Sequence, residues 1–158
     1  MKYVDTRVVF REVPDEITLA INISGCPVKC PGCHSSYLVR DIGTPLDFEA
    51  LEGLIAVNKG ISCVSFMGGD ADPAYVGQLA SKMKAAHPGL KACWYSGRDL
   101  ENAKPLLEIL DYVKVGPYID EFGPLDWETT NQRFYRIIHK EKGPALEDWT
   151  HRFKKKYL

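Results

Sequence analysis

The chain has 158 residues, 45% of them hydrophobic, and a formal net charge of −1. This length and composition predict one globular domain with enough apolar side chains for a core. The nearly neutral charge argues against a nucleic-acid partner, which needs a broadly basic face, and no apolar run approaches the roughly 20 residues of a membrane span.

Strand-like and helical segments alternate along the first two thirds of the chain. Apolar, β-rich runs predict strands at residues 7–13, 17–23, 62–67, 91–95 and 112–115. Helices are predicted at residues 47–58, from Asp72 to a stop at residues 87–89, and from Asp99 onward, with Asp47 and Asp72 as N-caps. A last short strand is expected at residues 133–138. Residues 139–158 read as a peripheral segment, with an amphipathic helix around 145–153.

This alternation predicts an α/β fold with a mostly parallel sheet and right-handed crossovers. In such sheets the functional loops lie beyond the carboxyl ends of the strands. We therefore expect one rim to collect the stretch that follows residue 23 and the segments 68–70, 96–98 and 116–118. Four βα units are too few for a complete eight-fold barrel.

Three cysteines stand in the stretch Gly25-Cys26-Pro27-Val28-Lys29-Cys30-Pro31-Gly32-Cys33-His34, at the spacing C-x₃-C-x₂-C. A complete cage for an iron–sulfur cluster supplies four thiolates, so three leave one iron open to another ligand. A structural zinc site is the alternative, but it wants a fourth Cys or His at a usual spacing, and His34 directly follows Cys33. We predict that Cys26, Cys30 and Cys33 hold an open 4Fe-4S cluster.

The other cysteine usage agrees with reduced thiols. Five cysteines, an odd number with three clustered, do not form a disulfide framework. Cys63 and Cys93 lie within apolar strands and are expected to be core residues. The N-terminus lacks the apolar stretch of a signal peptide, so we expect a cytoplasmic protein.

The cysteine spacing resembles that of the radical S-adenosylmethionine enzymes. Within that superfamily, the segments Ser24-Gly25-Cys26, Gly68-Gly69-Asp70 and Thr130-Asn131-Gln132 make the chain similar to the activating proteins of anaerobic ribonucleoside-triphosphate reductase, from about Arg7 to about Ile137. The resemblance implies a single radical SAM domain over residues 1–158, folded as a partial, open βα barrel.

The same resemblance implies an activity. S-adenosylmethionine is cleaved reductively at the cluster, and the resulting 5′-deoxyadenosyl radical generates a glycyl radical on the reductase. A flavodoxin or ferredoxin would supply the electron. No catalytic acid–base pair or nucleophile is evident in the sequence, which fits chemistry carried by the cofactor.

The resemblance also implies a binding site for S-adenosylmethionine. Gly68-Gly69-Asp70 is similar to a Gly-Gly-Glu motif that holds the methionine amino group, although a Gly-Gly pair after a strand also suits a tight turn. The expected cofactor-binding residues are Gly32, Cys33, His34, Gly68, Gly69 and Asp70.

Several roles stay open at this point. Ala71 is inserted before Asp72-Pro73, so either Asp70 or Asp72 can make the polar contact with the cofactor. We favour Asp70 as the cofactor contact and Asp72 as the helix cap. Ser96 and Asn131 are candidates for polar contacts to ribose or methionine.

Three other functions fit parts of the same pattern. The chain resembles, less closely, an activase of another glycyl-radical enzyme or a small radical enzyme such as a deazapurine synthase. A different class is a non-catalytic module that transfers electrons or binds zinc. No nucleic-acid or membrane partner is expected.

Overall fold

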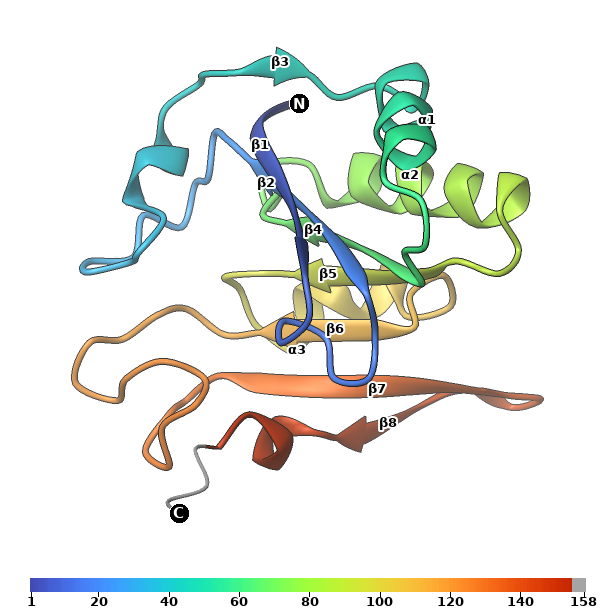
Figure 1. Cartoon of the computed structure of the whole chain (residues 1–158). Helices are drawn as coiled ribbons and strands as arrows, with labels where there is room; N and C mark the ends of the chain where they lie inside the picture. Colours follow the sequence, from blue (N-terminus) through green and yellow to red (C-terminus); the bar gives the residue numbers. More distant parts are fainter. Residues whose placement is uncertain (155–158) are drawn as a thin grey trace.

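The computed structural model describes residues 1–154, which form one eight-stranded mixed sheet in the order β3-β1-β2-β4-β5-β6-β7-β8 (Figure 1). The strands are β1 (Lys2–Val9), β2 (Thr18–Ile23), β3 (Thr44–Pro45), β4 (Cys63–Met67), β5 (Lys91–Tyr95), β6 (Tyr112–Val115), β7 (Arg133–Lys140) and β8 (Gly143–Asp148). The helices are α1 (Phe48–Val57), α2 (Pro73–Ala86) and α3 (Leu100–Ala103), with the short 3₁₀ turns η1 (Ser36–Val39), η2 (Lys104–Leu106) and η3 (Thr150–Phe153).

The expectation of a mostly parallel sheet in a partial, open βα barrel is wrong. Only the pairings β2–β4, β4–β5 and β5–β6 are parallel, whereas the other four pairings are antiparallel. The described residues contain three α-helices, and α3 has only four residues. The βα alternation extends only from β2 to β6. Within the described residues no helix separates β1 from β2, β6 from β7 or β7 from β8, and these directly joined strands pair antiparallel.

The middle of the chain matches the expected elements closely. The predicted strands 91–95 and 112–115 coincide with β5 and β6. The backbone N–H of Ala50 donates to Asp47 at 2.8 Å, and that of Tyr75 donates to Asp72 at 3.2 Å. Both N-caps are therefore confirmed, and each satisfies a backbone donor that the first helical turn leaves unpaired.

The C-terminal helix expected around residues 145–153 is wrong. Residues up to Asp148 form β8, in which Leu146 lies opposite Ile137 of β7, and a 3₁₀ turn follows. Trp149 and Phe153 pack against the sheet instead of forming a helical stripe. The segment expected to be peripheral, residues 139–158, thus contributes a strand, and its last four residues lie outside the described part.

The two faces of the sheet are covered differently. The helices α1, α2 and α3 pack on one face (Figure 1), over alternate strand residues such as Phe66, Trp94 and Val113. The other face carries a smaller apolar cluster formed by Val13, Cys63, Cys93, Tyr112 and Phe134. Strand side chains alternate between faces, so one sheet serves two separate cores.

Cys63 and Cys93 are core residues, as expected, and both are fully buried. Burial raises the pKa of the Cys63 thiol well above its usual range and that of Cys93 to about 12. Since a metal ligand must be a thiolate, these two side chains are poor ligands where they stand.

A buried carboxylate links the amino-terminal ends of the parallel strands β4, β5 and β6. Glu16, 7% exposed, accepts hydrogen bonds from Lys91 at 2.5 Å, Tyr112 at 2.7 Å and Ser62 at 2.5 Å. Burial alone would raise the pKa of Glu16, but the hydrogen bonds from these three residues hold it below its usual value.

We expect Glu16→Gln to lower the free energy of unfolding by about 1–3 kcal/mol at pH 7, because its partners lose a charged acceptor. Since the folded pKa is lowered, this contribution is complete above the unfolded value of 4.5 and is lost as the pH falls through the folded value. Denaturant unfolding between pH 7 and 3 measures this, with exposed Glu141→Gln as control. Equal pH slopes for wild type and Glu16→Gln would contradict the assignment.

Candidate iron–sulfur site

The loop between β2 and η1, residues 24–35, carries the three clustered cysteines and extends beyond the sheet (Figure 1). Its base is held by backbone bonds from Gly25 to Arg40 and from Cys26 to Leu38. Gly25, Lys29 and Gly32 have φ angles of 75°, 52° and 77°. These left-handed residues turn the chain sharply, which keeps the loop out of both helix and sheet.

Cys26, Cys30 and Cys33 are free thiols of intermediate burial in this loop. Within residues 1–154, no three or more Cys, His, Asp or Glu side chains are gathered in a group able to hold a metal ion. The structure therefore brings the three cysteines to one loop but not to one centre.

The loops after β5 and β6 pack against the cysteine loop. A Cβ atom at Gly97 would lie 3.1 Å from Cγ2 of Val28, so the Val28 side chain packs closely against the backbone at Gly97. A Cβ atom at Gly32 would lie 3.3 Å from the ring of Tyr118 and 3.4 Å from Asp120. The rings of His34 and Tyr118 are 6.1 Å apart.

Asp70 organises this support. The residue is 3% exposed, and its two carboxylate oxygens accept hydrogen bonds from the Ser96 hydroxyl at 2.5 Å and the Gly97 N–H at 2.8 Å. Asp70 thus fixes the loop that contacts Val28. The structure gives it this loop-holding role, and a direct contact with a cofactor stays a prediction. Asp72 is the cap of α2, as expected.

Gly68 and Gly69 form the turn from β4 into α2. Their φ angles are 112° and 94°, and a Cβ atom at Gly69 would lie 2.6 Å from Val76. The Gly68 N–H donates to the Tyr95 carbonyl, and its own carbonyl accepts from the Trp94 indole. The tight turn by itself therefore requires both glycines.

Lys114, which sequence reasoning missed, lies beneath the same rim. It is 8% exposed and donates to the carbonyls of Gly116 at 2.8 Å and Ser96 at 3.3 Å. Burial lowers the pKa of Lys114 to about 8, against the opposing influence of Asp70 and of the three cysteines in the loop. The detectable signal was a charged residue within the apolar run Tyr112–Val115.

The two polar candidates occupy different positions at the rim. Ser96, 1% exposed, links Asp70 to the N–H of Arg98 and has a structural role. Asn131 donates to the Pro117 carbonyl at 3.0 Å, but its Oδ1 atom is buried and has no partner within residues 1–154. A buried acceptor without a donor is uncommon and suits a ligand that supplies one.

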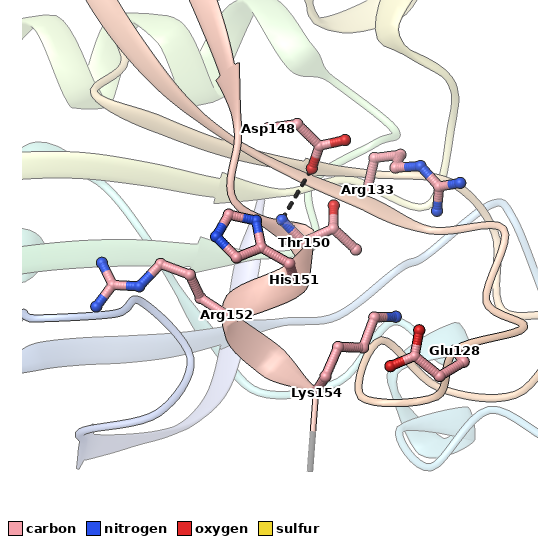
Figure 2. Close-up of a pocket in the computed structure, with 7 residues that line it drawn as sticks. All are labelled: Glu128, Arg133, Asp148, Thr150, His151, Arg152 and Lys154. Carbon is pink, nitrogen blue, oxygen red and sulfur yellow. Dashed lines mark hydrogen bonds between the residues drawn. The ribbon is translucent and has the colours of Figure 1, made fainter. Parts of the chain in front are cut away.

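A cavity of about 940 Å³ lies elsewhere, between the start of β7, the end of β8 and η3. Figure 2 shows Thr150 and His151 at its centre, with the Thr150 N–H donating to Asp148. Its lining is Glu128, Arg133, Asp148, Thr150, His151, Arg152 and Lys154. None of the expected site residues belongs to it.

Comparison with protein families places the cysteine loop in a known context. A family model described as a 4Fe-4S single cluster domain matches residues 17–136, which is more than half of the chain. The chain belongs to the 4Fe-4S single cluster domain family. The match begins next to β2, includes the cysteine loop and ends in β7. No curated protein and no solved structure matches the chain.

The donor set fits the cluster that this family name describes. Thiolates are the usual iron ligands, and Cys26, Cys30 and Cys33 form no disulfide and are partly accessible. Lys114 places a buried cation close enough to interact with all three, which offsets the negative charge of a thiolate-bound cluster. As a separate finding, no helix within residues 1–154 is long and apolar enough to cross a membrane.

We expect Gly97→Val to reduce the iron and sulfide bound per chain after anaerobic reconstitution, because the new side chain displaces Val28 and with it the cysteine loop. Adding Val28→Ala removes the contacts to Cγ1 and Cγ2 of Val28 and should restore most of the cluster content. Thermal unfolding of both variants separates loop displacement from general loss of the fold. Full iron binding by a folded Gly97→Val protein would contradict the idea that this contact positions the loop.

Proposed function

We propose that this protein is a radical S-adenosylmethionine activase that generates a glycyl radical on anaerobic ribonucleoside-triphosphate reductase. The observation that carries the proposal is a three-cysteine loop, at C-x₃-C-x₂-C spacing, in a chain of the 4Fe-4S single cluster domain family. Three protein ligands leave one iron position for a substrate, whereas an electron-transfer cluster usually has four.

The other two cysteines support an open position. Cys63 and Cys93 lie in the core cluster of the helix-free face, with raised pKa values, and do not belong to the cysteine loop. A fourth thiolate from either residue would require the core to open. This argues against the electron-transfer alternative, for which a closed cage is the rule.

When bound, the reduced cluster supplies the electron that cleaves a carbon–sulfur bond of S-adenosylmethionine. Cys26, Cys30 and Cys33 hold the cluster in this proposal, and the rim beside them binds the substrate. The buried Oδ1 of Asn131 is available to accept a hydrogen bond from an amino or hydroxyl group. Lys114 adds a fixed positive charge in a poorly hydrated setting, which favours a carboxylate nearby.

The protein partners follow from the same proposal. A glycine in a macromolecular substrate must reach the rim at the carboxyl ends of the central strands, and a flavodoxin or ferredoxin supplies single electrons to the cluster. The cavity of about 940 Å³ is lined by residues 128–154 and by none of the cysteine loop. A chain of 158 residues leaves little room for a large substrate pocket, which suits a protein substrate.

We expect the reconstituted, dithionite-reduced protein to convert S-adenosylmethionine to 5′-deoxyadenosine and Cys30→Ala to lose this activity by at least about 100-fold. Cys93→Ala is the matched control, since it removes a buried thiol outside the loop. Chromatography of the nucleoside products gives the rates. A stable cluster with no cleavage would overturn the radical assignment.

The partner requires its own measurement. Adding the anaerobic reductase should give the electron paramagnetic resonance signal of a glycyl radical, and its yield should follow 5′-deoxyadenosine formation. Cleavage of S-adenosylmethionine without this signal would retain the radical chemistry and remove the reductase as the substrate.

We expect Lys114→Met to lower the reduction potential of the cluster, on the order of tens of millivolts, because a nearby buried cation stabilises the more negative, reduced state. Lys114→Arg keeps the charge and should retain most of the potential. Anaerobic redox titration followed by electron paramagnetic resonance gives both values without relying on turnover. Equal potentials for Lys114→Met and wild type would remove Lys114 from the electrostatics of the site.

A further inference from the structure

The segment that joins β6 to β7, residues 116–132, lies at the same end of the sheet as the cysteine loop (Figure 1). We call it the β6–β7 loop. The two loops are in contact, since a Cβ atom at Gly32 would lie 3.3 Å from the ring of Tyr118 and 3.4 Å from Asp120. A molecule bound to the β6–β7 loop is therefore held next to the three cysteines.

The backbone of the β6–β7 loop is fixed by its own hydrogen bonds. The N–H groups of Phe122 and Gly123 both donate to the Ile119 carbonyl, at 3.0 and 2.9 Å. The hydroxyl of Thr129 donates to the Phe122 carbonyl at 2.7 Å, and that of Thr130 donates to the Gly123 carbonyl at 3.3 Å. A loop that is ordered before its partner arrives loses little conformational entropy on binding.

Two aromatic side chains of this ordered loop face solvent. Phe122 is 40% exposed and Trp127 is 50% exposed. Leu125, which lies between them in the sequence, packs against the apolar cluster on the helix-free face of the sheet. The loop thus buries one apolar side chain and leaves two large rings outside. Exposed aromatic groups of this kind mark interaction sites, and such side chains supply much of the binding energy at protein interfaces.

The ring of Trp127 is held in one position. A Cβ atom at Gly123, where φ is 78°, would overlap this ring, so the ring lies directly against the Gly123 backbone. Only glycine leaves room for it there. The Lys154 ammonium donates to the carbonyls of Leu125 and Trp127, which fixes the backbone beneath the ring. Trp127 is therefore a preorganised anchor.

The β6–β7 loop carries charges of one sign. Residues 116–132 include four acids, Asp120, Glu121, Asp126 and Glu128, and no lysine or arginine. Glu121 and Glu128 are exposed and make no hydrogen bond or ion pair within residues 1–154. A complementary partner surface therefore has lysine or arginine side chains around an apolar pocket.

We propose that the β6–β7 loop is the docking surface for the protein substrate. Trp127 and Phe122 enter an apolar pocket of that protein, and Glu121 and Glu128 pair with its basic side chains. The inference rests on the proposed function, because it takes the glycine-bearing protein as the occupant.

The position of the loop favours the substrate over the electron donor as this occupant. Hydrogen abstraction requires one glycine to be held in a defined place beside the cofactor, and rigid anchors next to the cysteine loop serve that purpose. An electron donor needs only a brief contact, and such redox encounters have small interfaces.

Anaerobic biolayer interferometry with the reconstituted protein immobilised and the anaerobic reductase in solution tests the proposal. Trp127→Ala should weaken binding by at least about tenfold, mainly through faster dissociation. Glu121→Lys/Glu128→Lys should weaken it as well and reduce its dependence on salt. The matched controls are Val57→Ala, which truncates a 78% exposed side chain of α1, and exposed Glu141→Lys; both should bind as wild type does.

A second variant leaves both aromatic side chains in place. Gly123→Ala displaces the Trp127 ring from the backbone and should also weaken binding, although the substituted residue is itself buried. Iron content and thermal unfolding show whether each variant carries its cluster and is folded. The glycyl-radical yield with dithionite as reductant, which needs no donor protein, should fall in parallel with binding.

The outcomes separate this inference from the proposed function. Folded Trp127→Ala that binds the reductase as tightly as wild type overturns the docking surface and leaves the proposed function intact. A yield that falls only when a flavodoxin supplies the electrons makes the donor the occupant and overturns the proposal. Wild type that cleaves S-adenosylmethionine without binding the reductase removes this partner and the docking surface together. Failure of the radical chemistry itself appears in wild type alone, as the absence of 5′-deoxyadenosine, and removes the occupant as well.

Discussion

The contact between Asp70 and the loop after β5 is the constraint on which the cysteine rim depends. Asp70 lies in the turn after β4 and accepts hydrogen bonds from Ser96 and Gly97. These bonds fix the backbone against which Val28 packs. A buried carboxylate whose two oxygens are both satisfied is rigid, and losing one donor would leave the charge poorly compensated. The position of the cysteine loop therefore depends on a residue outside it.

A second charge completes this arrangement. Lys114 is buried in β6, the strand next to β5, and the carboxylate of Asp70 favours the charged form of Lys114. Each group has its own hydrogen bonds, so the pair does not rely on direct contact for satisfaction. A buried ammonium and a buried carboxylate are costly alone, and together they set the charge of the rim.

The division of the sheet into two faces explains how the rim stays polar. The helices bury the face that carries Phe66, Trp94 and Val113. Successive side chains of a strand point to opposite faces, so Lys114, next to Val113, lies on the face without helices. Its partner in the β6–β7 pairing is Phe134. One face provides the apolar burial that stabilises the domain, and the other is left to accommodate charge near the strand ends.

The middle of the fold was readable from sequence because its signals are local. Strands β5 and β6 are short apolar runs, and Asp47 and Asp72 cap the helices that they precede. The flanks were misread because strand direction depends on which neighbour a strand meets. The turn that joins β7 to β8, Glu141-Lys142, lacks the Asn-Gly or Asp-Gly pair typical of hairpins, and the four-residue spacing of Trp149 and Phe153 resembles that of a helix.

The candidate site divides in the same way. The cysteines were found from their spacing, and the family match supports the cluster. Lys114 and the contact of Gly97 with Val28 were not found, because both depend on which strand ends lie side by side. A pattern in one segment reveals ligands, whereas the groups that position them come from other strands.

The segments Gly68-Gly69-Asp70 and Thr130-Asn131-Gln132 therefore support a ligand site to different extents. The hydrogen bonds of Asp70 are taken up by the protein, and Gly68 and Gly69 are required by the turn itself. Asn131 retains a buried acceptor beside the loop after β6. Thr18 has the other such side-chain atom in the described residues, at the start of β2 and far along that strand from the cysteines. In the proposed function, direct recognition of a ligand donor at the rim is therefore assigned to Asn131, and Asp70 acts through the loop that it holds.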